Sequence, residues 1–271
     1  NGHVCSQENT EALGKSIAEV VSARLAEAAN AREPFRLRMS NIGKHPKQLW
    51  YEKYHPENIQ PLEPSARIKF LFGDILERML IFLAKEAGHD VSEEQSRVEL
   101  EGIQGSMDCV IDGHVVDCKS ASTFSYKKFS SGELRRDDSF GYLWQISGYN
   151  TAYGSDNVPA FLVIDKTLGH ICLMEVPKEE LALYDVTSRI RNLKVALDNP
   201  NPPEGCCGGD EPLGKAGNRV LTVKSSYCNC KQDCWKGCND GKGLQKYFYS
   251  NGIKYFTKVV KEPKVDKEEA A

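Results

Sequence analysis

The sequence predicts a mixed α/β fold, in which a central β-sheet is flanked by helices. Three observations predict it: an apolar helical pattern ends near residue 87, an alternating apolar pattern follows it, and helical and alternating segments then take turns to about residue 197. We expect a helical N-terminal region at residues 1–64, the α/β core at 65–200, and a cysteine-rich segment at 201–271 that packs on the core.

Composition and charge narrow the classes of protein. The chain has 271 residues, 40% of them hydrophobic, which suffices for one large domain or one domain with an appendage. No stretch approaches the ~20 consecutive apolar residues of a membrane helix. We therefore expect a cytoplasmic protein without membrane contact. The net charge of −3 argues against a passive nucleic-acid coat protein, but not against an enzyme that holds metal ions with carboxylates.

Two long helices precede the predicted sheet. Residues 10–31 have the amphipathic spacing of a helix, which Pro34 ends. Ser65 is typical of an N-cap, and a second helix runs from it to about residue 87, where Gly88 stops it. We expect this second helix to be buried, because it is apolar on nearly every side and its polar side is confined to Asp74, Arg78 and Lys85.

Strands and helices then follow in order. The alternating pattern from residue 91 to 116 predicts strands, and Asp112-Gly113 between two apolar runs is a strong signal for a two-residue hairpin turn. After it we expect a polar loop at 120–138, a helix at 140–153, strands at 160–164 and 171–176, and one long helix from Pro177 to about residue 197. Trp50-Tyr51 and the run Tyr247–Tyr249 are predicted to pack in the core rather than to stack on DNA bases.

The hairpin concentrates charge on one face. Counting outward from the turn, Asp108 falls opposite Asp117, with Cβ atoms ~5 Å apart, where two like charges destabilise the pair. Lys119 lies two residues beyond Asp117 and projects from the same face. A divalent cation, which prefers oxygen ligands, would relieve this repulsion. The alternative is a solvent-facing strand on which Lys119 neutralises one aspartate.

Glu77 supplies a third carboxylate from the second long helix. On a helical wheel it lies among apolar residues, where an unpaired carboxylate is costly unless it is ligated. Gly73, one turn earlier, would let a backbone or ligand approach closely. Glu77 is therefore the expected third oxygen ligand of a metal that Asp108 and Asp117 hold.

These residues belong to four motifs in a fixed order. Gly73-Asp-Ile-Leu-Glu77, Gly105-Ser-Met-Asp108, Asp117-Cys-Lys119 and Gln145-Ile-Ser-Gly-Tyr149 together resemble the RecB-like branch of the PD-(D/E)xK nucleases. The likeness is greatest to the Cas4-like exonucleases of phages. It extends over about residues 40–251 and implies a restriction-endonuclease-like core.

The resemblance also implies a role for each matched residue. Glu77, Asp108, Asp117 and the Cys118 carbonyl would bind catalytic Mg²⁺ or Mn²⁺, and Lys119 would orient or help to activate the attacking water and stabilise the charged transition state. Gln145 and Tyr149, one helical turn apart, would contact DNA near the scissile phosphate. Among the basic clusters, we expect DNA contacts from Lys127, Lys128, Arg135 and Arg136, although for any one pair taken alone a solvated surface is the better explanation.

Six cysteines crowd into the C-terminal segment and favour a metal site over disulfides in a chain without a secretory signal. They are Cys206, Cys207, Cys228, Cys230, Cys234 and Cys238. The resemblance implies a 4Fe-4S cluster with one cysteine ahead of the motif helix and three spaced C-x2-C-x5-C. Here Ser225 occupies the first of those three positions, and residues 40–51 contain no cysteine. We expect structural Zn²⁺ ahead of a 4Fe-4S cluster, with reduced buried thiols as the alternative.

The function that the resemblance implies is a metal-dependent exonuclease that degrades DNA from its ends in phage or bacterial recombination or repair. The alternatives are a structure-specific or nicking endonuclease, a DNA-binding subunit with an inactive nuclease fold, and an unrelated zinc-binding interaction protein. Expected partners are single- or double-stranded DNA, a single-strand annealing protein or helicase, and further copies of the chain in a homo-oligomer.

Overall fold

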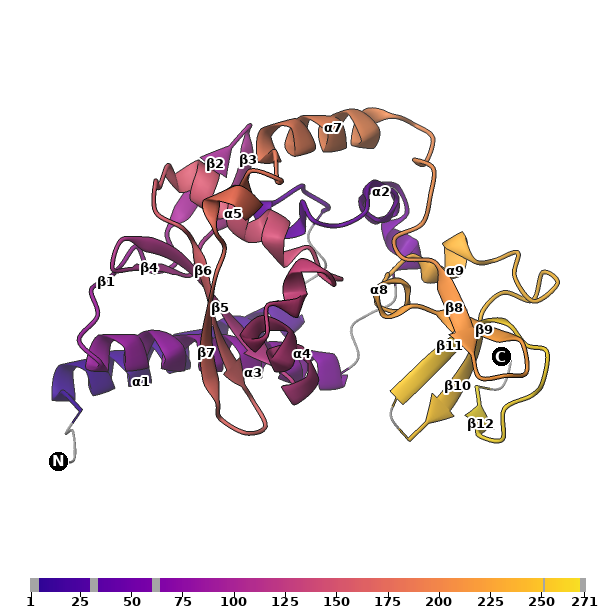
Figure 1. Ribbon diagram of the computed structural model, residues 1–271, viewed down its shortest axis with the longest axis horizontal. Coiled ribbons are helices and arrows are strands. Elements are labelled where there is room, and N and C mark those ends of the chain that lie inside the picture. Colours follow the sequence, from indigo (N-terminus) through magenta and orange to yellow (C-terminus); the bar gives the residue numbers. More distant parts are fainter. Residues whose placement is uncertain (1–4, 30–33, 60–63, 251, 269–271) are drawn as a thin grey trace. The chain divides into compact units, whose positions relative to one another are not determined.

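The fold was analysed in a computed structural model, which describes residues 5–29, 34–59, 64–250 and 252–268. The chain divides into two compact units, one formed by residues 1–43 and 61–192 and the other by residues 44–60 and 193–271. The predicted fold class is confirmed, since N-terminal helices, a mixed sheet with flanking helices and a cysteine-rich C-terminal region are all present (Figure 1). No helix among the described residues is long and apolar enough to cross a membrane.

A mixed five-stranded sheet forms the centre of the first unit. Its strands lie in the order β1-β4-β5-β6-β7, and only the central β5–β6 pair is parallel (Figure 1). The strands are β1 (Val91–Ser92), β4 (Cys109–Ile111), β5 (His114–Ala121), β6 (Ala160–Asp165) and β7 (Ile171–Glu175). The strands β2 (Arg97–Leu100) and β3 (Ile103–Ser106) form a separate antiparallel pair.

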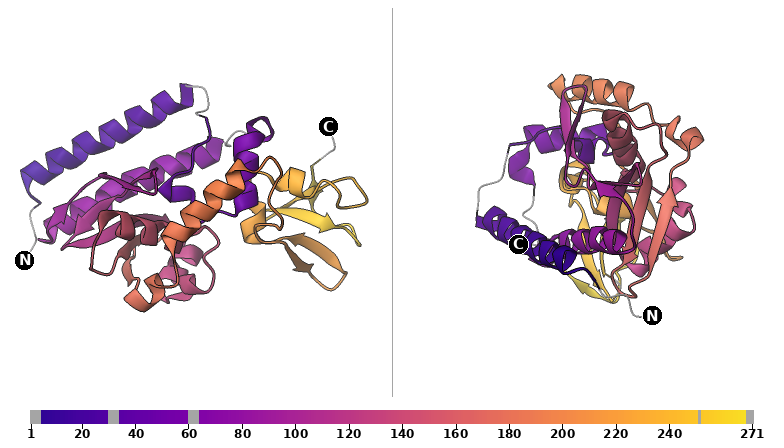
Figure 2. Two further views of the ribbon diagram at one scale, coloured as in Figure 1. Left: turned by 90° about the horizontal axis from the view of Figure 1, so that it is seen from above. Right: turned by 90° about the vertical axis from the view of Figure 1, so that its left-hand side faces the viewer.

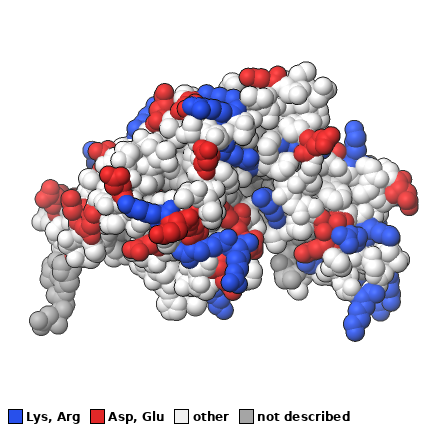
Figure 3. Space-filling model, turned by 45° about the horizontal axis from the view of Figure 1, so that its top comes forward, with Lys and Arg blue, Asp and Glu red and all other residues white. Residues whose placement is uncertain are grey.

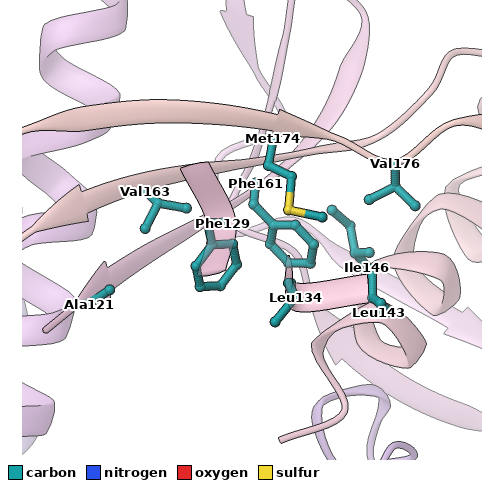
Figure 4. Packing of buried hydrophobic residues seen from close by; sticks show 9 residues of the cluster. All are labelled: Ala121, Phe129, Leu134, Leu143, Ile146, Phe161, Val163, Met174 and Val176. Atoms are coloured by element: carbon teal, nitrogen blue, oxygen red, sulfur yellow. The ribbon is translucent and has the colours of Figure 1, made fainter. Parts of the chain in front are cut away.

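Helices cover both faces of this sheet. The second half of α3 (Pro64–Glu86) packs Leu80 and Ile81 onto one face, where they meet Val116 of β5. On the other face, α4 (Thr123–Ser130), η3 (Glu133–Arg135) and α5 (Tyr142–Tyr153) enclose the core cluster drawn in Figure 4. In that cluster Phe129, Leu143 and Ile146 contact the alternate residues of β6 that α3 does not cover.

The helix α1 (Gln7–Ala29) lies alongside α3 in the first unit (Figure 2). The two helices run antiparallel, because Asn9 Nδ2 donates to Glu86 Oε1 at 2.6 Å near one end and Arg24 Nε lies 2.5 Å from Asp74 Oδ2 toward the other. The turn η1 (Met39–Asn41) places Met39 in the core. The predicted helix at 10–31 is thereby confirmed within the described residues.

Three expectations about helices were wrong. The first half of α3 is not buried, since Ile68, Phe70 and Phe72 are each about half exposed. The polar loop at 120–138 contains α4, because the Ser122 hydroxyl accepts from the Ser125 N–H as an N-cap, a local interaction that apolar periodicity does not reveal.

The third concerns the long helix expected after Pro177. It is interrupted, forming α6 (Lys178–Leu181) and α7 (Val186–Asp198). The Asp185 carboxylate accepts a hydrogen bond from the Ser188 N–H at 2.9 Å and so caps the start of a second helix. The continuous apolar periodicity had predicted a single helix through this point.

The second unit contains a five-stranded antiparallel sheet in the order β12-β10-β11-β9-β8. Its core is formed by Val220, Tyr247 and Phe256, all at most 2% exposed. The elements of the unit are α2 (Pro46–Tyr54), η2 (Pro56–Asn58), β8 (Asp210–Leu213), β9 (Asn218–Leu221), α8 (Val223–Ser226), α9 (Lys231–Cys234), β10 (Gln245–Tyr249), β11 (Gly252–Lys258) and β12 (Asp266–Lys267). Core packing of Trp50 and Tyr247 is confirmed, and the Trp50 indole donates to the Asn199 carbonyl at 2.8 Å. The prediction was wrong for Phe248, which is 41% exposed because strand alternation turns it to the opposite face from Tyr247.

Candidate active site

The charged hairpin forms as its turn residues predict. Asp112 and Gly113 have φ of +50° and +81°, the left-handed pair that a two-residue turn requires, and the ladder pairs Cys109 with Val116. Asp108 directly precedes β4, and its Oδ2 accepts from the Cys118 N–H at 2.7 Å. Asp108 is therefore held against β5, the strand that carries the other two charges.

Asp117 and Lys119 form a buried ion pair on β5. The Asp117 side chain is 1% exposed, and its Oδ2 lies 2.5 Å from Lys119 Nζ. Its other oxygen, Oδ1, is buried without a hydrogen-bond partner among the described residues. A buried carboxylate oxygen without a donor is unusual, because it has lost its hydration without replacement. One ligand position on Asp117 is thus available for an additional cation.

Glu77 approaches the same region from α3. Its Oε1 accepts from Gln95 Nε2 at 2.8 Å and lies 3.4 Å from Arg78 Nη1. Gln95 also donates its own N–H to the Asp108 carbonyl at 3.0 Å, and its φ is +55°. A non-glycine residue with this backbone conformation is uncommon, and such strain concentrates at functional sites. Gln95 therefore connects two of the three candidate ligands.

The sequence analysis made expectations about two neighbours of Glu77 on α3, Arg78 and Gly73. Arg78 does not belong to a solvated polar side of the helix; only 19% of its side chain is exposed, and it pairs with Glu77. At Gly73 a Cβ would lie 3.5 Å from Ser120 Oγ on β5, an ordinary contact distance, so the absence of a side chain is not what brings the helix and the strand together.

The three carboxylates and the lysine perturb one another. Burial, with the charges of Asp74 and Asp117, raises the pKa of Glu77 from 4.5 to about 7, against the opposing charge of Arg78. Burial and the charges of Asp117 and Glu77 raise the pKa of Asp108 well above its usual value. Burial disfavours the charged form of Lys119, yet the charges of Asp117 and Asp108 raise its pKa above the usual range. These residues therefore share one electrostatic site.

The donor set fits a hard divalent cation. Each carboxylate is already compensated by a protein group: Asp117 by Lys119, Asp108 by the Cys118 N–H and Glu77 by Gln95. Within the described ranges, no three His, Cys, Asp or Glu side chains are arranged so that they could hold a metal ion. The unpaired Asp117 oxygen and the mutual repulsion of three carboxylates are nevertheless what an oxygen-seeking cation would relieve.

One face of α5 extends the site. Gln145 Nε2 donates to Tyr149 Oη at 3.2 Å, and Tyr149 is 3% exposed, so its ring is packed in the protein. Burial and the charge of Asp117 raise the pKa of Tyr149 to about 12. The sequence motif therefore does bring Gln145 and Tyr149 close to the charged cluster.

Tyr142 is a site residue that the sequence analysis missed. Its ring centroid lies 5.2 Å from Lys119 Nζ, and burial with the nearby charge of Asp117 raises its pKa, while Lys119 opposes that rise. Tyr142 precedes Gln145 by three residues and Tyr149 by seven, which places all three on one helical face. That spacing is visible in the sequence, but it does not single out Tyr142 as the neighbour of Lys119.

The predicted basic DNA contacts lie on α4, at the end of η3 and directly after it. Lys127 and Arg136 are exposed. Lys128 instead pairs with Asp137, and Arg135 Nε donates to Glu180 Oε2 at 2.6 Å. The structure thus engages two of these four cations in ion pairs with the protein itself.

The cysteines of the second unit are all reduced. The sulfurs of Cys206 and Cys207 lie 3.9 and 3.8 Å from the fully buried Ser225 hydroxyl. A hydrogen bond from the neighbouring Cys207 thiol lowers the pKa of Cys228, but a hydrogen bond to Cys230 and burial outweigh it and raise that pKa to about 12. Burial, opposed by the charge of Lys47, raises the pKa of Cys234 to about 11. Metal binding by these cysteines stays a prediction.

Comparisons with known proteins give distant matches only. No protein-family model and no curated protein matches the chain. Among solved structures, SSO0001 is similar with a TM-score of 0.43 and 14% identity over 83% of this chain and 95% of that one. A phage-related exonuclease from Haemophilus somnus 129PT is similar with a TM-score of 0.35 and 15% identity over 72% of this chain and 87% of that one. Both are distant structural similarities at low identity.

Proposed function

We propose that the chain is a divalent-metal-dependent deoxyribonuclease that hydrolyses phosphodiester bonds from DNA ends. The observation that carries this proposal is the cluster of Glu77, Asp108 and Asp117, three mutually repelling carboxylates around one lysine in a largely buried site. A fold retains such a cluster against its own stability when the cluster has a use, and repelling carboxylates are ligands for a hard cation.

The chemistry of phosphodiester hydrolysis matches these groups. Bound Mg²⁺ or Mn²⁺ would lower the pKa of a water molecule and offset negative charge on the phosphate oxygens. Glu77, Asp108, Asp117 and the Cys118 carbonyl would hold it. The Lys119 ammonium keeps its proton because Asp117 and Asp108 favour the charged form. Lys119 would therefore act as a cation and hydrogen-bond donor that orients the water and stabilises the transition state.

Helix α5 would supply the substrate contacts. Gln145 is partly buried, whereas Tyr149 is buried, feels the charge of Asp117 and accepts a hydrogen bond from the Gln145 carboxamide. We therefore assign the direct DNA contact to Gln145 and a positioning role to Tyr149. Lys127 and Arg136 would add phosphate contacts that carry no sequence preference.

The test is degradation of end-labelled linear and closed circular DNA with Mg²⁺, Mn²⁺ or EDTA. Lys119→Ala and Asp108→Ala should abolish cleavage, whereas Lys15→Ala, at a lysine whose side chain is 80% exposed on α1, should not. Loss of linear DNA alone supports an exonuclease, and the label position gives its polarity. Cleavage of circular DNA would replace it with an endonuclease, and no cleavage under any metal would refute the nuclease.

A further inference from the structure

The outer face of the β10–β11 hairpin, in the second unit, presents aromatic, apolar and basic side chains together. Strand alternation buries Tyr247 and Phe256, both 0% exposed, and turns their neighbours outward. The strand register pairs Lys246 with Tyr255 and Phe248 with Ile253 on this outer face. Lys231 of α9 joins them, since its Nζ lies 4.7 Å from the Tyr255 ring centroid. These five residues are termed the lysine–aromatic face.

This face keeps large apolar groups in contact with water. Phe248 is 41% exposed and Ile253 is 47% exposed, although they lie directly opposite each other on adjacent strands. Lys246 Nζ lies 5.2 Å from the Phe248 ring centroid, so an ammonium already sits against the ring. An exposed aromatic ring beside a cation offers a stacking surface and a phosphate contact within one nucleotide's reach.

Lysines outnumber acidic residues around this face. Residues 241–268 contain seven lysines and three acidic residues, in a chain whose net charge is −3. Lys and Arg atoms are prominent at the lower right of Figure 3, with Asp and Glu atoms beside them. The acidic residues approach from the segment after the hairpin: Asp266 of β12 pairs with Phe248 in the strand register, and Glu268 Oε1 lies 2.6 Å from Lys246 Nζ. A ligand with its own negative charge can take over this exposed ion pair.

We propose that the lysine–aromatic face binds single-stranded DNA. A base would stack on Phe248 and contact Ile253, while Lys246 and Lys231 would bind the flanking phosphates. Single strands are favoured over duplex because a duplex hides the faces of its bases within its own stack. The proposal goes beyond the nuclease function, because none of the nuclease residues belongs to this face. It rests on the proposed function only in naming DNA as the polymer that is bound.

Fluorescence anisotropy of a labelled oligothymidine of ~20 nucleotides, with the full chain in EDTA, tests the proposal. Because stacking contributes about 1–3 kcal/mol per base, Phe248→Ala should weaken binding by about five-fold or more. Lys246→Ala should lower the slope of log affinity against log salt by about 0.7. Phe72→Ala, at a phenylalanine that is 55% exposed on α3, and Lys215→Ala, at an exposed lysine of the β8–β9 turn, are the matched controls and should bind like the wild type.

Several outcomes would overturn the proposal. One is equal affinity of Phe248→Ala and Phe72→Ala, after thermal melts confirm that both variants fold. Another is competition by duplex DNA as effective as that by the single strand. The two proposals can fail independently of each other. If binding in EDTA depends on Phe248 but no DNA is cleaved in Mg²⁺ or Mn²⁺, the binding face is supported and the nuclease function is refuted. Cleavage without any effect of Phe248 does the reverse.

Discussion

Replacing Glu77 by glutamine should stabilise the metal-free protein while abolishing nuclease activity. Glutamine preserves the size of the side chain and the carbonyl oxygen that accepts from Gln95 at 2.8 Å. It removes a carboxylate that burial and the charges of Asp74 and Asp117 destabilise. The change therefore isolates the electrostatic cost of the site, because it alters the charge and leaves the packing unchanged. Most other substitutions at this site would alter both.

The magnitude follows from the pKa of Glu77. A rise from 4.5 in the unfolded chain to about 7 in the fold corresponds to about 3 kcal/mol. Because the folded pKa is raised, the folded state binds the proton more tightly. Below pH 4.5 both states are protonated and the penalty is absent. It grows as the pH rises from 4.5 to 7 and is complete above 7. The advantage of Glu77→Gln should follow the same course.

The assay is denaturant unfolding of wild type and Glu77→Gln in EDTA at several pH values between 4.5 and 8. The two proteins should be equally stable at pH 4.5, and the variant should be more stable by about 3 kcal/mol at pH 8. Glu19→Gln, at a carboxylate that is 68% exposed on α1, is the control and should match the wild type throughout. Parallel stability curves for wild type and Glu77→Gln would refute the reasoning.

Three further outcomes are expected. Lys119→Met leaves the buried Asp117 charge unpaired and should lower the free energy of unfolding in urea by about 3–5 kcal/mol. The double variant Lys119→Met/Asp117→Asn should recover most of that stability without recovering activity, and an additive loss would contradict the pairing. Tyr142→Phe keeps the ring beside Lys119 and should keep kcat. Tyr142→Leu should change kcat more than it changes KM, and should lower kcat further than the core control Phe129→Leu does. Equal losses of kcat in the two leucine variants would assign the effect to packing alone. In Gly105→Ala the new Cβ would lie 2.6 Å from two neighbouring side chains, so thermal melts should show a loss of about 1–3 kcal/mol, and an unchanged melt would contradict that close packing.

Local chemistry made the centre of the fold predictable. Asp112-Gly113 specifies a turn of known length, and the turn sets the register that brings Asp108 near Asp117. The position of Glu77 followed from helical periodicity. Each of these inferences needs only residues that are close in the chain. The break before α7 and the helix α4 depend on single capping hydrogen bonds, which periodicity does not reveal.

The contacts of Tyr142 and Gln95 complete the site. The reason why the sequence did not predict them is a different one. Glu77, Asp117 and Lys119 attract notice because charged residues at apolar positions violate the rules for a stable core, and such violations mark functional sites. Tyr142 violates nothing, since a partly buried aromatic residue on a core-facing helix is ordinary. Gln95 lies in a polar turn, where glutamine is equally unremarkable. Their contacts with Lys119 and Glu77 join segments that are remote in sequence. A residue that supports a site while obeying every local rule can therefore be found only in three dimensions.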